Sequence, residues 1–155
     1  MDASDAHSAN RALVSRWVED VFNRRDNEAC SAIAADAYEE HAVAPFGQAA
    51  PGPVNGPQNL QLTAEWLIAQ FPDLHMTIEA MVAEGDTVAV RILSTGTNLG
   101  PLNGVMPSTG KPFRATQSHW FRIANGRLAE HWATRDDLGT MLQLGVIPPP
   151  AGRRP

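Results

Sequence analysis

Residues 113–136 read FRATQSHWFRIANGRLAEHWATRD, and Asn125-Gly126 lies near the middle of this stretch. An Asn-Gly pair between two runs rich in aromatic and aliphatic residues is a strong signal for a two-residue hairpin turn, because both residues tolerate a positive φ angle. The stretch therefore predicts two long antiparallel strands, Phe113–Ile123 and Arg127–Asp136.

The register of this hairpin decides which side chains share a face of the sheet. With a two-residue turn and no bulge, His119 lies opposite Trp132, and alternation along each strand brings five residues to one face. These residues are Gln117, His119, Phe121, Trp132 and Asp136. The other face receives Trp120, Arg122, His131 and Arg135. Because the first set mixes aromatic rings with an amide, an imidazole and a carboxylate, it is typical of a small-molecule pocket rather than of an aliphatic core.

Three helical segments are expected before the strands begin. Residues 10–24 repeat apolar side chains at helical spacing and predict an amphipathic helix. Asn27 can cap a shorter, alanine-rich helix that runs through Ala37. A third helix begins at Pro57 and ends before Phe71.

A first hairpin precedes the one described above. His75–Ala83 and Thr87–Thr95 are rich in β-branched residues and are joined by a short Gly-containing turn. Three helices followed by at least four strands, without βαβ alternation, indicate an α+β fold. In such a fold the helices pack on one face of a mostly antiparallel sheet.

The chain of 155 residues is expected to form a single domain over residues 1–155. Its core spans about residues 8–147, and a proline-rich tail follows at 148–155. Residues 42–57 contain four prolines and three glycines and predict a long loop. Loops of this length in compact domains are often functional.

Composition excludes several classes of partner. The net charge is -5 and no basic stripe is present, so neither nucleic acid nor an anionic membrane is expected as a partner. A single cysteine, Cys30, excludes an internal disulfide framework and favours a cytoplasmic location. The first five residues lack the features of a signal peptide, and no apolar run approaches about 18 residues.

The motifs of the common cofactor and metal chemistries are missing. The sequence has no dinucleotide or phosphate-binding glycine loop, no Gly-x-Ser-x-Gly elbow and no zinc-ligand pair. A metal site of His41, His119 and Asp136 has no supporting ligand spacing. We therefore expect neither cofactor nor metal, and any activity must use acid and base groups. Asp136 can instead cap the following helical turn, and the other candidates can be ordinary core or surface residues.

Several short stretches, in this order and spacing, carry a resemblance to a known family. They are residues 21–26 (VFNRRD), 71–74 (FPDL), 83–88 (AEGDTV), 96–97 (GT), 107–111 (PSTGK), 121–123 (FRI), 130–132 (EHW) and the segment from Asp136 to Gly145. Over roughly residues 8–147 the chain resembles the SnoaL-like polyketide cyclase family, within the nuclear-transport-factor-2-like superfamily. The resemblance implies a cone-like α+β barrel around an apolar pocket, and a homodimer or higher homo-oligomer joined through the outer sheet face.

The resemblance also implies an activity, which is ring closure of an aromatic polyketide by intramolecular aldol chemistry without metal or cofactor. It assigns the acid/base role to Asp136, a polar pair to Gln117 and His119, and a further site position to His41. On this hypothesis Trp132 and Phe121 provide apolar surroundings for the Asp136 base, while His119 and Gln117 stabilise the enolate oxygen. Two alternatives stay open. One is a non-catalytic module that binds a small ligand or forms a dimer, and the other is epoxide hydrolysis or isomerisation in the same pocket.

Overall fold

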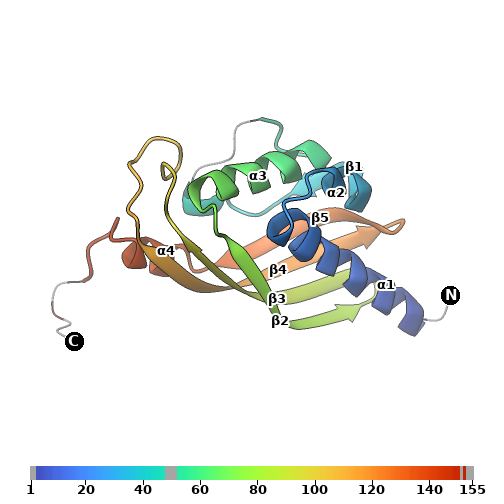
Figure 1. The fold of residues 1–155 in the computed structure, drawn as a ribbon. Coiled ribbons are helices and arrows are strands. Elements are labelled where there is room, and N and C mark those ends of the chain that lie inside the picture. Colours follow the sequence, from blue (N-terminus) through green and yellow to red (C-terminus); the bar gives the residue numbers. More distant parts are fainter. Residues whose placement is uncertain (1–2, 48–51, 151, 153–155) are drawn as a thin grey trace.

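The structure is a computed structural model of the chain that describes residues 3–47, 52–150 and 152. Its framework is a five-stranded sheet with the strand order β1-β5-β4-β3-β2 (Figure 1). The strands are β1 (Ala34–Glu40), β2 (His75–Glu84), β3 (Thr87–Thr97), β4 (Pro112–Ala124) and β5 (Arg127–Arg135). Strands β2 to β5 pair antiparallel, and β1 runs parallel to β5 at the edge of the sheet.

Helices cover one face of this curved sheet (Figure 1). They are α1 (Ala3–Arg16), the π-helix η1 (Trp17–Asn23), α2 (Glu28–Ile33), the short 3-10 helix η2 (Pro45–Gly47) and α3 (Pro57–Gln70). A last helix, α4 (Asp137–Gln143), follows β5 at the end of the sheet. The predicted α+β fold, with three N-terminal helical segments packed against a strongly curved and mostly antiparallel sheet, is confirmed. Among the described residues, no helix is both long and apolar enough to cross a membrane.

The segment after the second helix differs from the prediction. The expected helix through residue 37 ends at Ile33, and Ala34–Glu40 forms strand β1 instead. This strand adds to the free edge of β5, and the Arg127 guanidinium donates a hydrogen bond to the Ser31 carbonyl at 2.8 Å. Pairing with a distant strand therefore overrides the local helix preference of an alanine-rich segment.

The turn of the second hairpin forms as predicted. Asn125 and Gly126 have φ angles of 52° and 71°, which is the conformation that a two-residue hairpin turn needs. Ala124 and Arg127 flank the turn, and Ile123 pairs with Leu128 one position farther along the strands, as expected from a two-residue turn.

One residue farther from the turn, the expected register is wrong. Ile123 pairs with Leu128 but Arg122 pairs with Glu130, so Ala129 is an extra residue in β5. Such a β-bulge shifts every later partner by one position and exchanges the two faces of the bulged strand. His119 consequently pairs with Ala133, Trp120 with Trp132, Phe121 with His131 and Gln117 with Arg135.

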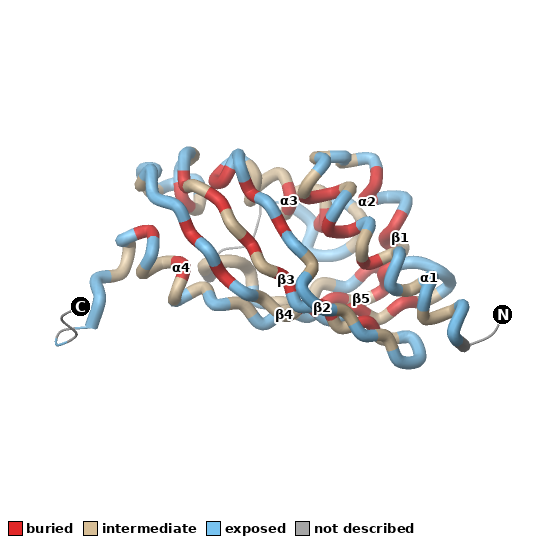
Figure 2. The backbone as a smooth tube through the Cα atoms, turned by 60° about the horizontal axis from the view of Figure 1, so that its bottom comes forward, coloured by how far each residue is buried: buried red, intermediate tan, exposed pale blue. Residues whose placement is uncertain are grey.

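The core lies between the helices and the concave face of the sheet. Figure 2 shows buried residues alternating with intermediate or exposed ones along much of β3 and β4, as expected for strands with one covered face. The buried face of η1 packs on β4, where the rings of Trp17 and Phe121 lie 5.0 Å apart, edge to face. Toward α3 and the segment that follows β1, the core is not filled, and this space is the candidate site.

Candidate active site

A cavity of about 290 Å³ lies between α3, the inner face of the sheet and residues 42–46. Most of its wall is apolar, with Phe46, Leu60, Leu67, Phe71, Met76 and Phe113 among the lining side chains. Its polar wall is formed mainly by Glu40, Gln117, His119, His131, Arg135 and Asp137. A concave apolar surface with a few convergent polar groups suits the binding of a small organic molecule.

Strand β4 places the first two polar groups. Gln117 and His119 are two positions apart, so both side chains point to the inner face, and His119 is only 4% exposed. The Nε2 atom of His119 lies 2.9 Å from the Oε1 atom of Gln117. Of the predicted site residues, these two are the ones that the structure brings together in the cavity wall.

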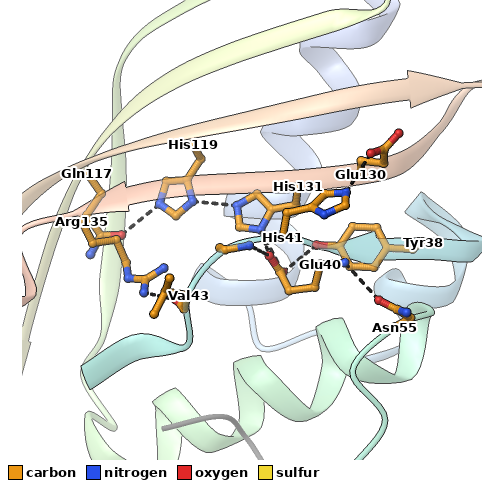
Figure 3. A network of polar contacts seen from close by, with 11 residues as sticks. Tyr38, Glu40, His41, Val43, Asn55, Gln117, His119, Glu130, His131 and Arg135 are labelled. Atoms are coloured by element: carbon orange, nitrogen blue, oxygen red, sulfur yellow. Dashed lines mark hydrogen bonds and ion pairs between the residues drawn. The ribbon is translucent and has the colours of Figure 1, made fainter. Parts of the chain in front are cut away.

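Strands β5 and β1 extend this polar pair into a row (Figure 3). The Nδ1 atom of His119 lies 2.9 Å from the Nε2 atom of His131, and the Nδ1 atom of His131 lies 2.8 Å from the Oε1 atom of Glu40. The Tyr38 hydroxyl donates to Glu40 at 3.0 Å, and the backbone N–H of Ala42 donates to the same carboxylate at 2.9 Å. The row therefore runs from a cavity amide to a carboxylate that accepts several hydrogen bonds.

The environment sets the charge state of the groups in this row. Burial, and then the nearby positive charges of His131 and Arg135, hold the pKa of His119 well below its usual range, so its imidazole is neutral near pH 7. Burial opposes ionisation of Glu40, but the hydrogen bond and charge of His131, assisted by Ala42 and Tyr38, hold the pKa of that carboxyl below its usual value. A neutral imidazole thus faces the cavity, with an ionised carboxylate behind it.

A second cluster ties residues 42–46 to the end of β5. The Arg135 guanidinium donates to the Asp137 carboxylate at 3.3 Å and to the Val43 carbonyl. The backbone N–H of Phe46 donates to the same Asp137 carboxylate at 3.3 Å. Arg135 and Asp137 both line the cavity, so these contacts also fix the position of its covering segment.

Three further polar atoms in the lining are buried and have no hydrogen-bond partner among the described residues. They are the indole Nε1 of Trp17, the amide Oδ1 of Asn59 and the hydroxyl of Ser94. Buried polar groups are normally satisfied, so an unpaired group in a cavity wall is available to a bound molecule. Together they offer a donor, an acceptor and a hydroxyl, which can serve as either.

The expected position of Asp136 in the pocket is wrong, because the bulge turns alternate β5 residues outward. Asp136 is exposed and lies outside the cavity lining. Its Oδ1 atom accepts a hydrogen bond from the backbone N–H of Gly139 at 2.8 Å, which makes Asp136 the N-cap of α4. Asp137, which strand alternation without a bulge pointed away from the pocket, lines it instead.

The expected cavity positions of Trp132, His41 and Phe121 are also wrong. Trp132 is 40% exposed on the outer face, where its ring stacks on that of His41 at 4.7 Å. His41 Nε2 lies 2.8 Å from the Glu130 carboxylate. Phe121 faces inward but is fully buried in the core behind the cavity, against the His131 ring. A metal site of His41, His119 and Asp136 is excluded by the same placements.

Sequence reasoning missed Glu40, His131, Arg135 and Asp137. The sequence correctly placed His131 and Arg135 on the same face of the sheet. It assigned them to the outer face, whereas both lie on the inner face. Glu40 follows from strand β1, which the sequence did not predict. Allowing for a one-residue bulge in β5 would have placed His131 and Arg135 on the cavity face, but no residue in the local sequence signals that bulge.

Another group of potential metal-ligand atoms lies outside the cavity. Atoms of Glu39, His41 and Glu130 come within 4.8 Å of one another near the surface. We assign no metal ion to this group, because Glu130 already pairs with the Arg122 guanidinium and with His41.

The chain is similar in sequence to known polyketide cyclases. Residues 12–144 match the family model described as SnoaL-like polyketide cyclase. The aklanonic acid methyl ester cyclase DauD of Streptomyces sp. (strain C5) is 34% identical over 104 residues, a match that covers 66% of this chain and 64% of that protein. A nogalonic acid methyl ester cyclase of Streptomyces nogalater is 32% identical over 91 residues, covering 58% of this chain and 67% of that protein.

The fold is also similar to that of solved structures. IdmH, a proposed polyketide cyclase from Streptomyces antibioticus, superposes with a TM-score of 0.73 and is 30% identical. That comparison covers 88% of this chain and 98% of IdmH. The match with DauD, in contrast, spans just under two thirds of the length of that relative.

Proposed function

The chain belongs to the SnoaL-like polyketide cyclase family, and on this basis we propose that it closes a ring in a polyketide-like small molecule by aldol-type chemistry inside the cavity. The observation that carries the proposal is the neutral, buried imidazole of His119 beside the Gln117 amide in an otherwise largely apolar wall. This arrangement offers a base and a hydrogen-bonding group and needs no cofactor.

The proposed reaction moves one proton and forms one carbon–carbon bond. The Nε2 atom of His119 takes a proton from a carbon that lies between carbonyl groups, and the resulting enolate attacks a second carbonyl carbon of the same molecule. The new alkoxide then takes a proton back, so that product and substrate are isomers. The flanking carbonyls make the substrate acidic, so a weak base is sufficient.

The polar groups around His119 are suited to bind the oxygen atoms of such a substrate. Gln117 and Arg135 can donate hydrogen bonds to an oxygen whose negative charge grows during the reaction. The unpaired atoms of Trp17, Asn59 and Ser94 can bind other carbonyl and hydroxyl oxygens. The apolar wall can hold the substrate in a folded conformation for ring closure, a reaction in which orientation contributes much of the rate.

The substrate class proposed first is an oxygenated aromatic polyketide ester. The named relatives act on methyl esters of aklanonic and nogalonic acid. The test is to incubate the purified chain with such methyl esters and to follow the appearance of a cyclised isomer of unchanged mass. His119→Gln should lower the turnover rate by about 10²–10⁴-fold, which is the usual share of general acid–base catalysis.

His75→Gln is the matched control, because His75 is an exposed histidine at the start of β2, outside the cavity lining. It should leave turnover unchanged. Ligand binding without any turnover by the unmodified chain would instead favour the non-catalytic binding module. Full activity of the folded His119→Gln variant would contradict His119 as the base.

We also propose that two copies of the chain pair through the outer face of β4 and β5. Trp120 and Trp132 are directly opposite each other in neighbouring strands and are 48% and 40% exposed. An exposed pair of tryptophans beside charged side chains of both signs, Arg122 and Glu130, is suited to a self-complementary contact.

A further inference from the structure

We propose that Glu40 and His131 are positioning residues that form a proton relay behind His119. In this relay His119 exchanges the proton with the substrate, and His131 carries the positive charge beside the Glu40 carboxylate. The inference rests on the proposed function, in which His119 is the base, and it names the groups that make such a base workable in an apolar wall.

The relay is a continuous row of hydrogen-bonding atoms (Figure 3). The imidazoles of His119 and His131 lie nearly parallel, with 9° between the ring planes, and their facing nitrogens are 2.9 Å apart. The far nitrogen of His131 lies 2.8 and 2.9 Å from the two oxygens of Glu40. Tyr38 and the Ala42 backbone hold that carboxylate in place.

Counting protons along the row leaves two arrangements. The ionised Glu40 only accepts, so Nδ1 of His131 carries a proton. The two facing nitrogens are 2.9 Å apart and share a single proton between them. When that proton is on His119, both rings are neutral and Nε2 of His119 has a free lone pair. When it is on His131, that ring is an imidazolium and Nε2 of His119 carries a proton instead.

The second arrangement contains one proton more than the first and places the charge where the protein can stabilise it. A positive charge on His119 would be buried at 4% exposure, beside the Trp17 indole and close to the Arg135 guanidinium. A positive charge on His131 lies against a carboxylate instead. Because an opposite charge at this distance favours the ionised form, the proton is more stable on the Glu40 side of the row.

The transfer balances in both directions. As Nε2 of His119 takes the substrate proton, the Nδ1 proton of His119 passes to Nε2 of His131, and His119 stays neutral throughout. Protonation of the product alkoxide reverses both transfers. In the structure the Oε1 atom of Gln117 faces Nε2 of His119, which matches the proton-loaded arrangement, because an amide oxygen only accepts; when Nε2 loses its proton, this hydrogen bond ends and the lone pair is open to the substrate.

The charged and titratable groups that face the pair are few. Glu40 and Tyr38 approach from β1, Arg135 from β5, and Asp137 offsets the charge of Arg135. Helix η1 contributes the uncharged Trp17 ring. Glu40 is therefore the group in direct contact whose negative charge should set how strongly the pair binds its proton.

Glu40→Gln tests this role through the pH dependence of the reaction. The variant keeps the size of the side chain and removes its charge, so the pair should bind its proton more weakly and the base form should persist to lower pH. We expect the acid limb of the kcat profile to move to lower pH and kcat to fall by on the order of 10²-fold with KM nearly unchanged. Glu40→Asp retains the charge and should keep the acid limb close to its original position.

Glu39→Gln is the matched control, because Glu39 is the adjacent residue on β1 and its side chain is exposed and points toward His41. It should leave the pH profile unchanged. A Glu40→Gln profile with an unmoved acid limb would overturn the relay, because a merely structural carboxylate changes stability and not the limb.

Nitrogen-15 NMR of the histidine side chains tests the relay without any substrate. In the ligand-free chain, lowering the pH should add one proton to the pair, leaving both nitrogens of His131 protonated and Nδ1 of His119 unprotonated. Protonation of both nitrogens of His119 would overturn the proposal, as would a Glu40→Gln spectrum that titrates like the original. The expected spectra in a chain that turns over no polyketide ester would overturn the proposed function and still support proton sharing by this pair.

Discussion

Asp136 is the residue at which the sequence hypothesis and the structure differ most. Its carboxylate accepts the Gly139 N–H and caps α4 from an exposed position. Asn caps a helix about as well as Asp, so Asp136→Asn should change the free energy of unfolding by less than about 0.5 kcal/mol and should leave turnover unchanged. Asp136→Ala should lose about 1 kcal/mol, and urea unfolding measures both values.

A large loss of activity in Asp136→Asn would instead assign the base role to Asp136. If the folded Asp136→Asn variant loses about 10²–10⁴-fold in rate, Asp136 acts as the base despite its exposed position. His119→Gln would then be the variant with the smaller effect. The two substitutions thus separate the two assignments in one assay.

The predicted site residues show which orientations could be predicted from the sequence and which could not. Gln117 and His119 follow the turn by alternation along an unbulged strand, and their inward orientation was predicted correctly. Trp132 and Asp136 lie beyond Ala129 on the partner strand, and one extra residue there exchanged their face. Nothing in the local residue types of Leu128-Ala129-Glu130 encodes a bulge, so single-sequence alternation fails beyond it.

At the scale of elements, strong local patterns were the ones that could be predicted. The helical spacing of residues 10–24, the Asn-Gly turn and the β-branched runs all correspond to observed elements. Strand β1 could not be predicted in this way, because its stability comes from pairing with β5, about 90 residues away in the chain. Because Glu40 lies on that strand, its position beside His131 could not be predicted from local sequence patterns.

The contacts of Asp137 at the start of α4 lead to a prediction about the segment that covers the cavity. Asp137→Ala removes the acceptor of the Phe46 N–H and a partner of Arg135. Residues 42–46 should then be held less firmly. A hydrogen bond to a charged group contributes about 1.5–3 kcal/mol, so we expect KM to rise by roughly tenfold and the Phe46 amide to exchange faster with solvent.

Asp137→Asn distinguishes the hydrogen bond to the covering segment from the ion pair with Arg135. The Asn side-chain oxygen can still accept from Phe46, while the ion pair is lost. Slow exchange of the Phe46 amide should therefore be retained in Asp137→Asn. Equal exchange rates in the unmodified chain and in Asp137→Ala, measured by hydrogen–deuterium exchange, would show that Asp137 does not hold the segment.

For the whole molecule, the arrangement of hydrophobic residues was sufficient to predict an α+β fold, but the cavity depends on register. The outer face illustrates the same limit. His131 and Arg135 were expected there beside Trp120 and Arg122, but they line the cavity, and Trp132 takes the outward position. The exposed face consequently carries two tryptophans beside the Arg122–Glu130 ion pair, which strengthens the case for a contact between copies.

Sedimentation of the purified chain tests the proposed homodimer. We expect a species of twice the chain mass at micromolar concentration, and Trp120→Glu should convert it to the monomer, because a buried carboxylate without a partner is costly at the centre of an interface. Val105→Glu is the control, since Val105 is 76% exposed in the segment between β3 and β4. The dimer should survive that substitution. A monomer in the unmodified chain, or a dimer that Trp120→Glu leaves intact, would exclude the outer face of β4 and β5 as the interface.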